Sequence, residues 1–106
     1  MPYRISITPK ARRQIKALPG SVQQRVRTAI RALRLDPYPL GVKKLKSLEG
    51  FYRIRVGDYR VVYSVEEQLL LLLVVTVGHR KDVYRKLGEK YDRERLLSLI
   101  TGEKPE

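Results

Sequence analysis

The residues best suited to chemistry in this sequence are cations and a phenol, all found between positions 53 and 84. They are Arg53, Arg55, Arg60, His79, Arg80 and Tyr84. A planar guanidinium group can bind two phosphate oxygens at once, and a histidine or tyrosine can move a proton or stack on a base. These residue types indicate a surface that binds a phosphate polyanion.

Several common kinds of active site are disfavoured by composition. The chain has no cysteine and one histidine, which argues against thiolate nucleophiles, disulfides and metal centres built from Cys or His. We find no Gly-rich phosphate loop, carboxylate pair or Ser/His/Asp arrangement, and we expect no cofactor and no metal. Cations and a phenol suit RNA cleavage in which the RNA supplies its own 2′-hydroxyl as nucleophile.

The positive charge of the chain also has a plainer interpretation. Lys and Arg total 23 against 11 Asp and Glu, a net charge of +12. Such a charge favours an anionic partner, whether nucleic acid, anionic lipid or an acidic protein, but arginines on an exposed strand can also be only a solvated face. A second basic cluster, Lys43, Lys44 and Lys46, is predicted to lie in a loop and to contact RNA.

Two consecutive strands are predicted to position the arginines. In residues 51–56 tyrosine and apolar side chains alternate with Arg53 and Arg55, and in residues 59–65 they alternate with Arg60. Alternating side chains point to opposite faces of a sheet. If the tyrosine and apolar faces pack under helices, all three arginines point to the uncovered face.

A third strand is predicted to lie in the centre of the same sheet. Residues 68–77 are apolar on both faces, which is typical of a covered strand, and we expect the leucines in residues 69–73 to be core. Gly57-Asp58 predicts the hairpin turn before the second strand. Glu66-Glu67 predicts the next turn, and Gly78 is expected to end the third strand.

The N-terminal part of the chain predicts a strand and two helices. Residues 3–7 alternate as a half-buried strand does. Thr8-Pro9 predicts an N-cap followed by proline in the first helical turn. Ser21 and Gln24 fit a capping box for a second amphipathic helix, which Asp36-Pro37 would end.

We therefore expect one α+β domain over residues 1–106, with two N-terminal helices packed on one face of a mainly antiparallel four-stranded sheet (βααβββ). Residues 36–50 are predicted to be a loop with a short turn at 42–45. Residues 92–100 predict a C-terminal helix, and residues 101–106 a frayed tail. The sequence starts without an apolar signal-peptide core and its longest apolar run is too short to span a bilayer, so we expect a cytoplasmic protein without membrane contact.

Two segments of the sequence resemble the RelE/ParE superfamily of bacterial and archaeal toxins, and more specifically its RelE branch. They are LKSLEGFYRIRVGDYRVVYSV at 45–65 and VVTVGHRKDVY at 74–84. The predicted order of elements is similar too. The resemblance implies a RelE-like microbial ribonuclease fold and the toxin of a type II toxin–antitoxin system. It also implies a metal-independent endoribonuclease that cleaves mRNA in the ribosomal A site.

The resemblance implies a role for each candidate residue. Arg53 and Arg60 would hold and neutralise the scissile phosphate. Arg80 would stabilise or protonate the leaving 5′-oxygen, and Tyr84 would orient or deprotonate the 2′-hydroxyl and stack on the base. Arg55 stands where the bacterial branch often has lysine. Since a guanidinium is a poor base, proton transfer would fall to Tyr84 or His79.

The partners implied by the resemblance are the ribosome with its mRNA and an acidic, RelB-like antitoxin. Toxin and antitoxin would form a hetero-oligomer that binds operator DNA. Two alternatives stay open: a ParE-like toxin that binds and poisons DNA gyrase, and a non-catalytic RNA-binding homologue. Arg80 and Tyr84 favour the nuclease, because the gyrase-binding branch characteristically lacks this arginine–tyrosine end.

Overall fold

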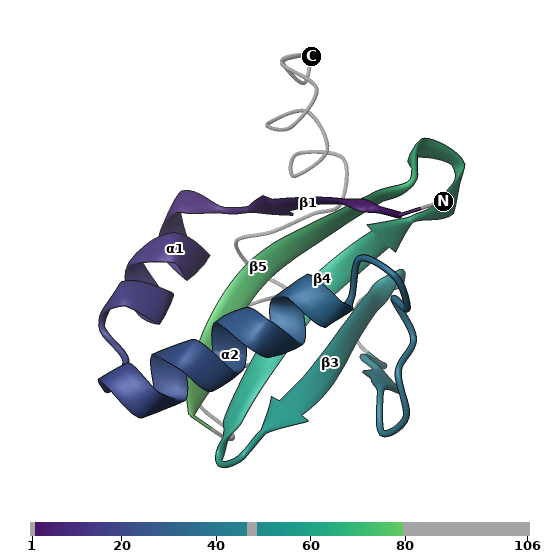
Figure 1. The fold of residues 1–106 in the computed structure, drawn as a ribbon. Helices are drawn as coiled ribbons and strands as arrows, with labels where there is room; N and C mark the ends of the chain where they lie inside the picture. Colours follow the sequence, from purple (N-terminus) through teal and green to yellow (C-terminus); the bar gives the residue numbers. More distant parts are fainter. Residues whose placement is uncertain (1, 47–48, 80–106) are drawn as a thin grey trace.

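Two helices cover one face of a five-stranded sheet in the structure, a computed structural model that describes residues 2–46 and 49–79 (Figure 1). The elements are β1 (Arg4–Ile7), α1 (Pro9–Lys16), α2 (Gly20–Ala32), β2 (Lys43–Lys44), β3 (Phe51–Val56), β4 (Tyr59–Glu66), the 3-10 turn η1 (Glu67–Leu69) and β5 (Leu71–His79). The predicted α+β class is confirmed. The predicted helix at 92–100 lies outside the described residues.

The strands are ordered β1-β5-β4-β3-β2 across the sheet. β1 runs parallel to β5, and the other pairs are antiparallel. The sheet has one more strand than predicted, because Lys43–Lys44 pairs with β3 where the sequence predicted a turn. No helix among the described residues is long and apolar enough to cross a membrane.

Thr8 begins α1 and also ties this helix to the central strand. Its hydroxyl oxygen accepts a hydrogen bond from the Ala11 amide at 3.1 Å and donates one to the Val75 carbonyl at 3.1 Å. Pro9 follows in the first helical turn. The predicted cap is confirmed, and its second hydrogen bond fixes the start of α1 on the sheet.

The predicted capping box of the second helix is wrong. α2 begins at Gly20 with Pro19 as its N-cap, and no side chain caps it. Ser21 therefore lies inside the first turn, where its hydroxyl is past the position from which an N-cap accepts an amide. The helix also ends at Ala32, before the predicted stop at Asp36-Pro37.

The core lies between the helices and one face of the sheet. Apolar side chains of α1 and α2, among them Ile15 and Val26, pack with those of β3, β4 and β5. Tyr63 is fully buried there, and its hydroxyl donates to the Pro37 carbonyl at 2.6 Å. This bond anchors the chain that follows α2 to the centre of the sheet.

The boundaries of the central strand differ from those predicted. Leu69 belongs to η1 and is 49% exposed, so it is not core, and Leu70 has a left-handed backbone (φ 49°). β5 starts only at Leu71. Gly78 does not end it, because Gly78 pairs with Arg60 and the strand continues to His79. Apolarity alone did not reveal the turn that precedes the strand.

Candidate nucleic-acid interface and family membership

Arg53 lies in the middle of β3, between Val62 on β4 and Lys43 on β2. It is only 9% exposed, and its Nη1 has no hydrogen-bond partner among the described residues. As predicted, Arg53 lies on the face of β3 opposite Ile54 and Val56, which pack with the helices, but the prediction that this face is uncovered is wrong at this position. Phe51 and Val62, which share its face, are also buried, because strand alternation decides which face a side chain takes and not how exposed that face is.

A buried guanidinium with an unpaired nitrogen is a costly feature for a fold. Burying a charge without a full set of partners disfavours the folded state. An anion that reached Nη1 of Arg53 would complete its hydrogen bonding and neutralise its charge. This geometry is the strongest sign of an anion-binding position in the described residues.

Arg60 lies on the same face, but its guanidinium is bound to the turn between β3 and β4. Its Nη1 donates to the Gly57 carbonyl at 3.2 Å and to the Tyr59 carbonyl at 3.0 Å. Gly57 takes a positive φ of 61°, which glycine adopts without strain. Arg60 therefore holds the hairpin turn.

Arg55 faces Arg60 directly across the β3–β4 pair. At this end no further strand of the described residues lies beside β3, because β2 pairs only with Tyr52 and Arg53. Arg55 lines a cleft of about 390 Å³ between α2 and β3, and a second of about 470 Å³ beside Arg25. By register, one face of the sheet carries Arg53, Arg55 and Arg60. Their surroundings differ, since Arg53 is buried, Arg60 is bonded to the hairpin turn and Arg55 lines a cleft.

His79 takes the end of β5, opposite Tyr59. The two rings meet edge to face, with centroids 5.3 Å apart. Because Tyr59 alternates with Arg60, the register places His79 on the face opposite Arg60. The structure does not bring His79 beside Arg53, and its part in proton transfer stays a prediction. Arg80 and Tyr84 lie outside the described residues, so their predicted roles stay predictions too.

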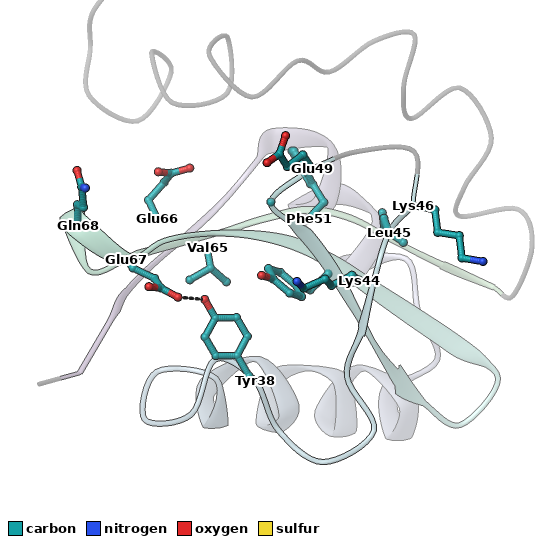
Figure 2. Close-up of a pocket in the computed structure, with 12 residues that line it drawn as sticks. Tyr38, Lys44, Leu45, Lys46, Glu49, Phe51, Val65, Glu66, Glu67 and Gln68 are labelled. Atoms are coloured by element: carbon teal, nitrogen blue, oxygen red, sulfur yellow. Dashed lines mark hydrogen bonds between the residues drawn. The ribbon is translucent and has the colours of Figure 1, made fainter.

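The three lysines predicted as one RNA-binding cluster separate into two groups. Lys43 pairs with Arg53 and Lys44 with Tyr52, so they lie on opposite faces of the sheet. Lys44 and Lys46 line a cleft of about 820 Å³ at the end of the sheet (Figure 2). The sequence could not show this division, because a two-residue strand has no alternation to read.

Tyr38 is the residue of this cleft that sequence reasoning did not single out. Its hydroxyl donates to Glu67 at 2.5 Å (Figure 2). Its ring meets the Tyr52 ring edge to face, with centroids 5.1 Å apart. Tyr52 in turn stacks on Tyr63 at 6.0 Å. The pKa of Tyr38 is raised above its usual value, mainly because the phenol is partly buried and next because of its hydrogen bond to Glu67. Burial is also the main cause that raises the pKa of Tyr63. Both phenols therefore hold their protons and are poor bases.

The sequence matches one family model and several named toxins. A family model described as ParE toxin of type II toxin-antitoxin system, parDE, matches residues 5–84. Toxin RelG of Mycobacterium tuberculosis is 31% identical over 87 residues, which cover 81% of this chain and all of that protein. Toxin RelE of the same organism is 32% identical over 85 residues, covering 79% of this chain and 88% of the relative.

Solved structures show the same fold. The toxin of the archaeal RelE–RelB complex from Pyrococcus horikoshii superposes with a TM-score of 0.68 at 29% identity, covering 76% of this chain and 98% of that one. A chain of the RelBE2 toxin–antitoxin complex from Mycobacterium tuberculosis superposes with a TM-score of 0.64 at 29% identity, covering 76% of this chain and 100% of that one. The protein therefore belongs to the RelE/ParE superfamily of type II toxin–antitoxin toxins, in its RelE-like branch.

Proposed function

We propose that this toxin is a ribosome-dependent endoribonuclease that cleaves mRNA in the A site. The observation that carries the proposal is Arg53, a buried guanidinium whose Nη1 has no partner among the described residues. An mRNA phosphate would supply the missing acceptors. The RelE names of the relatives support the nuclease over other uses of such a cation.

The proposed reaction needs no group beyond the protein and its substrate. The RNA 2′-hydroxyl would lose its proton to Tyr84 or His79 as its oxygen bonds to the adjacent phosphorus. The bond from phosphorus to the 5′-oxygen breaks, that oxygen gains a proton from Arg80 or water, and a cyclic phosphate remains on the upstream fragment. Arg53 and Arg60 would neutralise the charge that builds on the phosphoryl oxygens. Arg55 would add to the positive field, Arg80 would stabilise the leaving 5′-oxygen, and Tyr84 would position the 2′-hydroxyl and stack on the base.

The proposed partners follow from charge and from what the relatives bind. Similar structures are described as RelE–RelB complexes, and this chain carries a net charge of +12. We therefore propose an acidic, RelB-like antitoxin, a toxin–antitoxin hetero-oligomer that binds operator DNA, and a cytoplasmic location. The same charge suits the RNA-lined A site.

Gyrase poisoning is the second candidate function, because the matching family model carries the ParE name. The two functions leave different damage in a cell. Brief induction of the toxin, followed by mapping of mRNA 5′ ends, should show cuts inside codons of translated messages. Chromosomal breaks that depend on gyrase, together with intact messages, would contradict the nuclease and favour the second candidate.

A further inference from the structure

We infer that the groove between α2 and β3 is a pocket for one unpaired nucleotide of single-stranded RNA, which places its base in the apolar part and its phosphate on arginines. The groove consists of the two clefts that Arg55 lines, of about 390 and 470 Å³, which adjoin because Ala29 and Ala32 line both. The inference rests on the proposed nuclease function for the source of the RNA.

The first of these clefts suits a flat ring by its size and its lining. Apolar side chains of α2, β3 and the loop after α2 make most of its walls, and they include Ala29, Ala32, Leu33, Pro39 and Ile54. A cleft of this volume lies in the range of small-ligand sites, which are typically apolar with a few polar groups that fix the orientation. Unpaired RNA bases are the parts of an RNA that bind in such places.

Two arginines meet at the second cleft and have no partners of their own. Arg25 of α2 and Arg55 of β3 line it together, and neither guanidinium has a hydrogen-bond or ion-pair partner among the residues that the structure describes. The Arg25 guanidinium lies against the β3–β4 turn, where a Cβ added to Gly57 would be 3.5 Å from each of its Nη atoms. Within the described part of the chain no carboxylate lines this cleft, so its charge favours an anion such as a phosphate.

Asp36 gives the pocket a means of choosing between bases. It lines the apolar cleft, and its Oδ1 accepts a hydrogen bond from the Tyr38 amide at 3.1 Å, which orients the carboxylate. An ionised carboxylate only accepts hydrogen bonds, so it would bind a base that offers an exocyclic amino group. Cytosine offers this group, whereas uracil has a carbonyl oxygen at the same position. We therefore expect the pocket to prefer cytosine to uracil.

RNA fits the groove better than an acidic protein segment does. The carboxylate of Asp36 would repel a second carboxylate in the apolar cleft, whereas it binds the amino group of a base. Arg55 also shares a face of the sheet with Arg53. An RNA strand with a phosphate at Arg53 therefore reaches the groove by passing over the edge of β3.

The test compares the binding of oligocytidine and oligouridine of equal length to the full-length toxin, without ribosomes. The two RNAs carry the same charge and differ only on the edge of the base that would face Asp36. Oligocytidine should bind about tenfold more tightly, the effect typical of one hydrogen bond to a charged group. Asp36→Asn can donate to the uracil carbonyl and should remove this preference.

Three further variants separate the two parts of the pocket. Arg25→Gln should weaken the binding of both RNAs alike and lower the slope of log affinity against log salt by about 0.7, the value for one phosphate contact to a single strand. Ala32→Leu narrows the groove and should remove the cytosine preference while the salt slope stays. Arg13→Gln, exposed on α1 and outside the groove, is the matched control and should keep both.

Chemical footprinting identifies the RNA that fills the pocket on the ribosome. Dimethyl sulfate methylates the pairing edge of unpaired cytosine and adenine. We expect one such base to be protected in ribosomes that carry the Arg53→Leu toxin, which should leave the message uncut. Protection that Asp36→Asn abolishes assigns the base to mRNA or to ribosomal RNA. The absence of any base whose protection depends on Asp36 would overturn the use of the pocket on the ribosome.

The outcomes separate the pocket from the nuclease. Equal affinity for the two RNAs, in a toxin that cleaves mRNA on ribosomes, would overturn the pocket and leave the nuclease intact. A cytosine preference that depends on Asp36, in a toxin that does not cleave, would refute the nuclease alone. If Arg25→Gln loosens a complex with an acidic antitoxin and leaves RNA binding unchanged, the groove binds protein and the inference is wrong. Circular dichroism of each variant checks that the fold is unchanged.

Discussion

Arg55 and Arg60 lie directly opposite each other on β3 and β4, two like charges on one face of the sheet. Like charges in this arrangement destabilise a strand pair, typically by about 0.2–1 kcal/mol. We therefore expect Arg55→Thr to raise the free energy of unfolding by a few tenths of a kcal/mol at low salt. Urea unfolding measures the gain, which should shrink at high salt. A loss of stability at both salt concentrations would show that the repulsion is outweighed by packing of the Arg55 stem.

Arg53 predicts a conflict between stability and activity. Arg53→Leu removes a buried charge whose Nη1 has no hydrogen-bond partner in the described part of the chain, and it keeps an apolar side chain beside Phe51 and Val62. Replacing buried ionic groups by apolar ones often stabilises by about 1–4 kcal/mol, so the variant should unfold at higher urea concentration. It should also lose cleavage, because the phosphate loses its partner.

Arg53→Lys is the matched control for this substitution. It keeps a charge but loses the fork that binds two oxygens, so we expect partial activity and no gain in stability. A less stable Arg53→Leu variant would show that the Arg53 guanidinium stabilises the folded state, through contacts outside the described residues.

Thr8 predicts a stability effect without an effect on the chemistry. Thr8→Ala removes both the Ala11 cap and the bond to the Val75 carbonyl. Loss of an N-cap typically costs about 1 kcal/mol, and the second bond adds a similar amount. Thr8→Ser keeps both hydrogen bonds, so its free energy of unfolding should fall much less than that of Thr8→Ala. Ser21→Ala should change little, because Ser21 caps nothing; an equal loss at Ser21 would contradict the observed start of α2.

Tyr38 and Tyr63 predict how stability changes in alkali. Their pKa values are raised in the folded protein, so the folded state favours the neutral phenols. Their contribution is complete below the ordinary tyrosine pKa of about 10 and is lost as the pH rises above it, where the unfolded chain ionises first. The free energy of unfolding of Tyr63→Phe, measured in urea, should therefore fall less with rising alkaline pH than that of the wild type. Tyr3→Phe is the control and should follow the wild-type curve.

The elements that carry alternation were predictable from sequence. β3 has the predicted bounds, β4 extends one residue further than predicted, and the Thr8 cap was identified from two residues. These features depend on neighbours along the chain, which the sequence displays directly. The face shared by Arg53 and Arg60 followed from the same alternation.

What escaped prediction depends on contacts between distant segments. β2 is strand only because Lys43 and Lys44 meet β3. The pairing of His79 with Tyr59 sets its face, and no local pattern encodes that register. The burial of Arg53 likewise depends on what surrounds its face. The residue types of the candidate site were therefore predictable from sequence. Which face of the sheet each residue takes, and how buried it is there, depends on the register between strands.

The parallel pairing of β1 with β5 has a consequence for how the toxin is made. Arg4 pairs with Leu71 and Ile7 with Val74. During synthesis β1 therefore cannot form its strand pair until β5 has been made. Until β5 has emerged from the ribosome, β1 with its two helices and the β3–β4 hairpin have no strand to join them. Contacts this far apart in sequence make folding slow. A message broken before codon 71 would yield a chain that lacks the strand paired with both β1 and β4, so truncated products of this gene should be harmless to the cell that makes them.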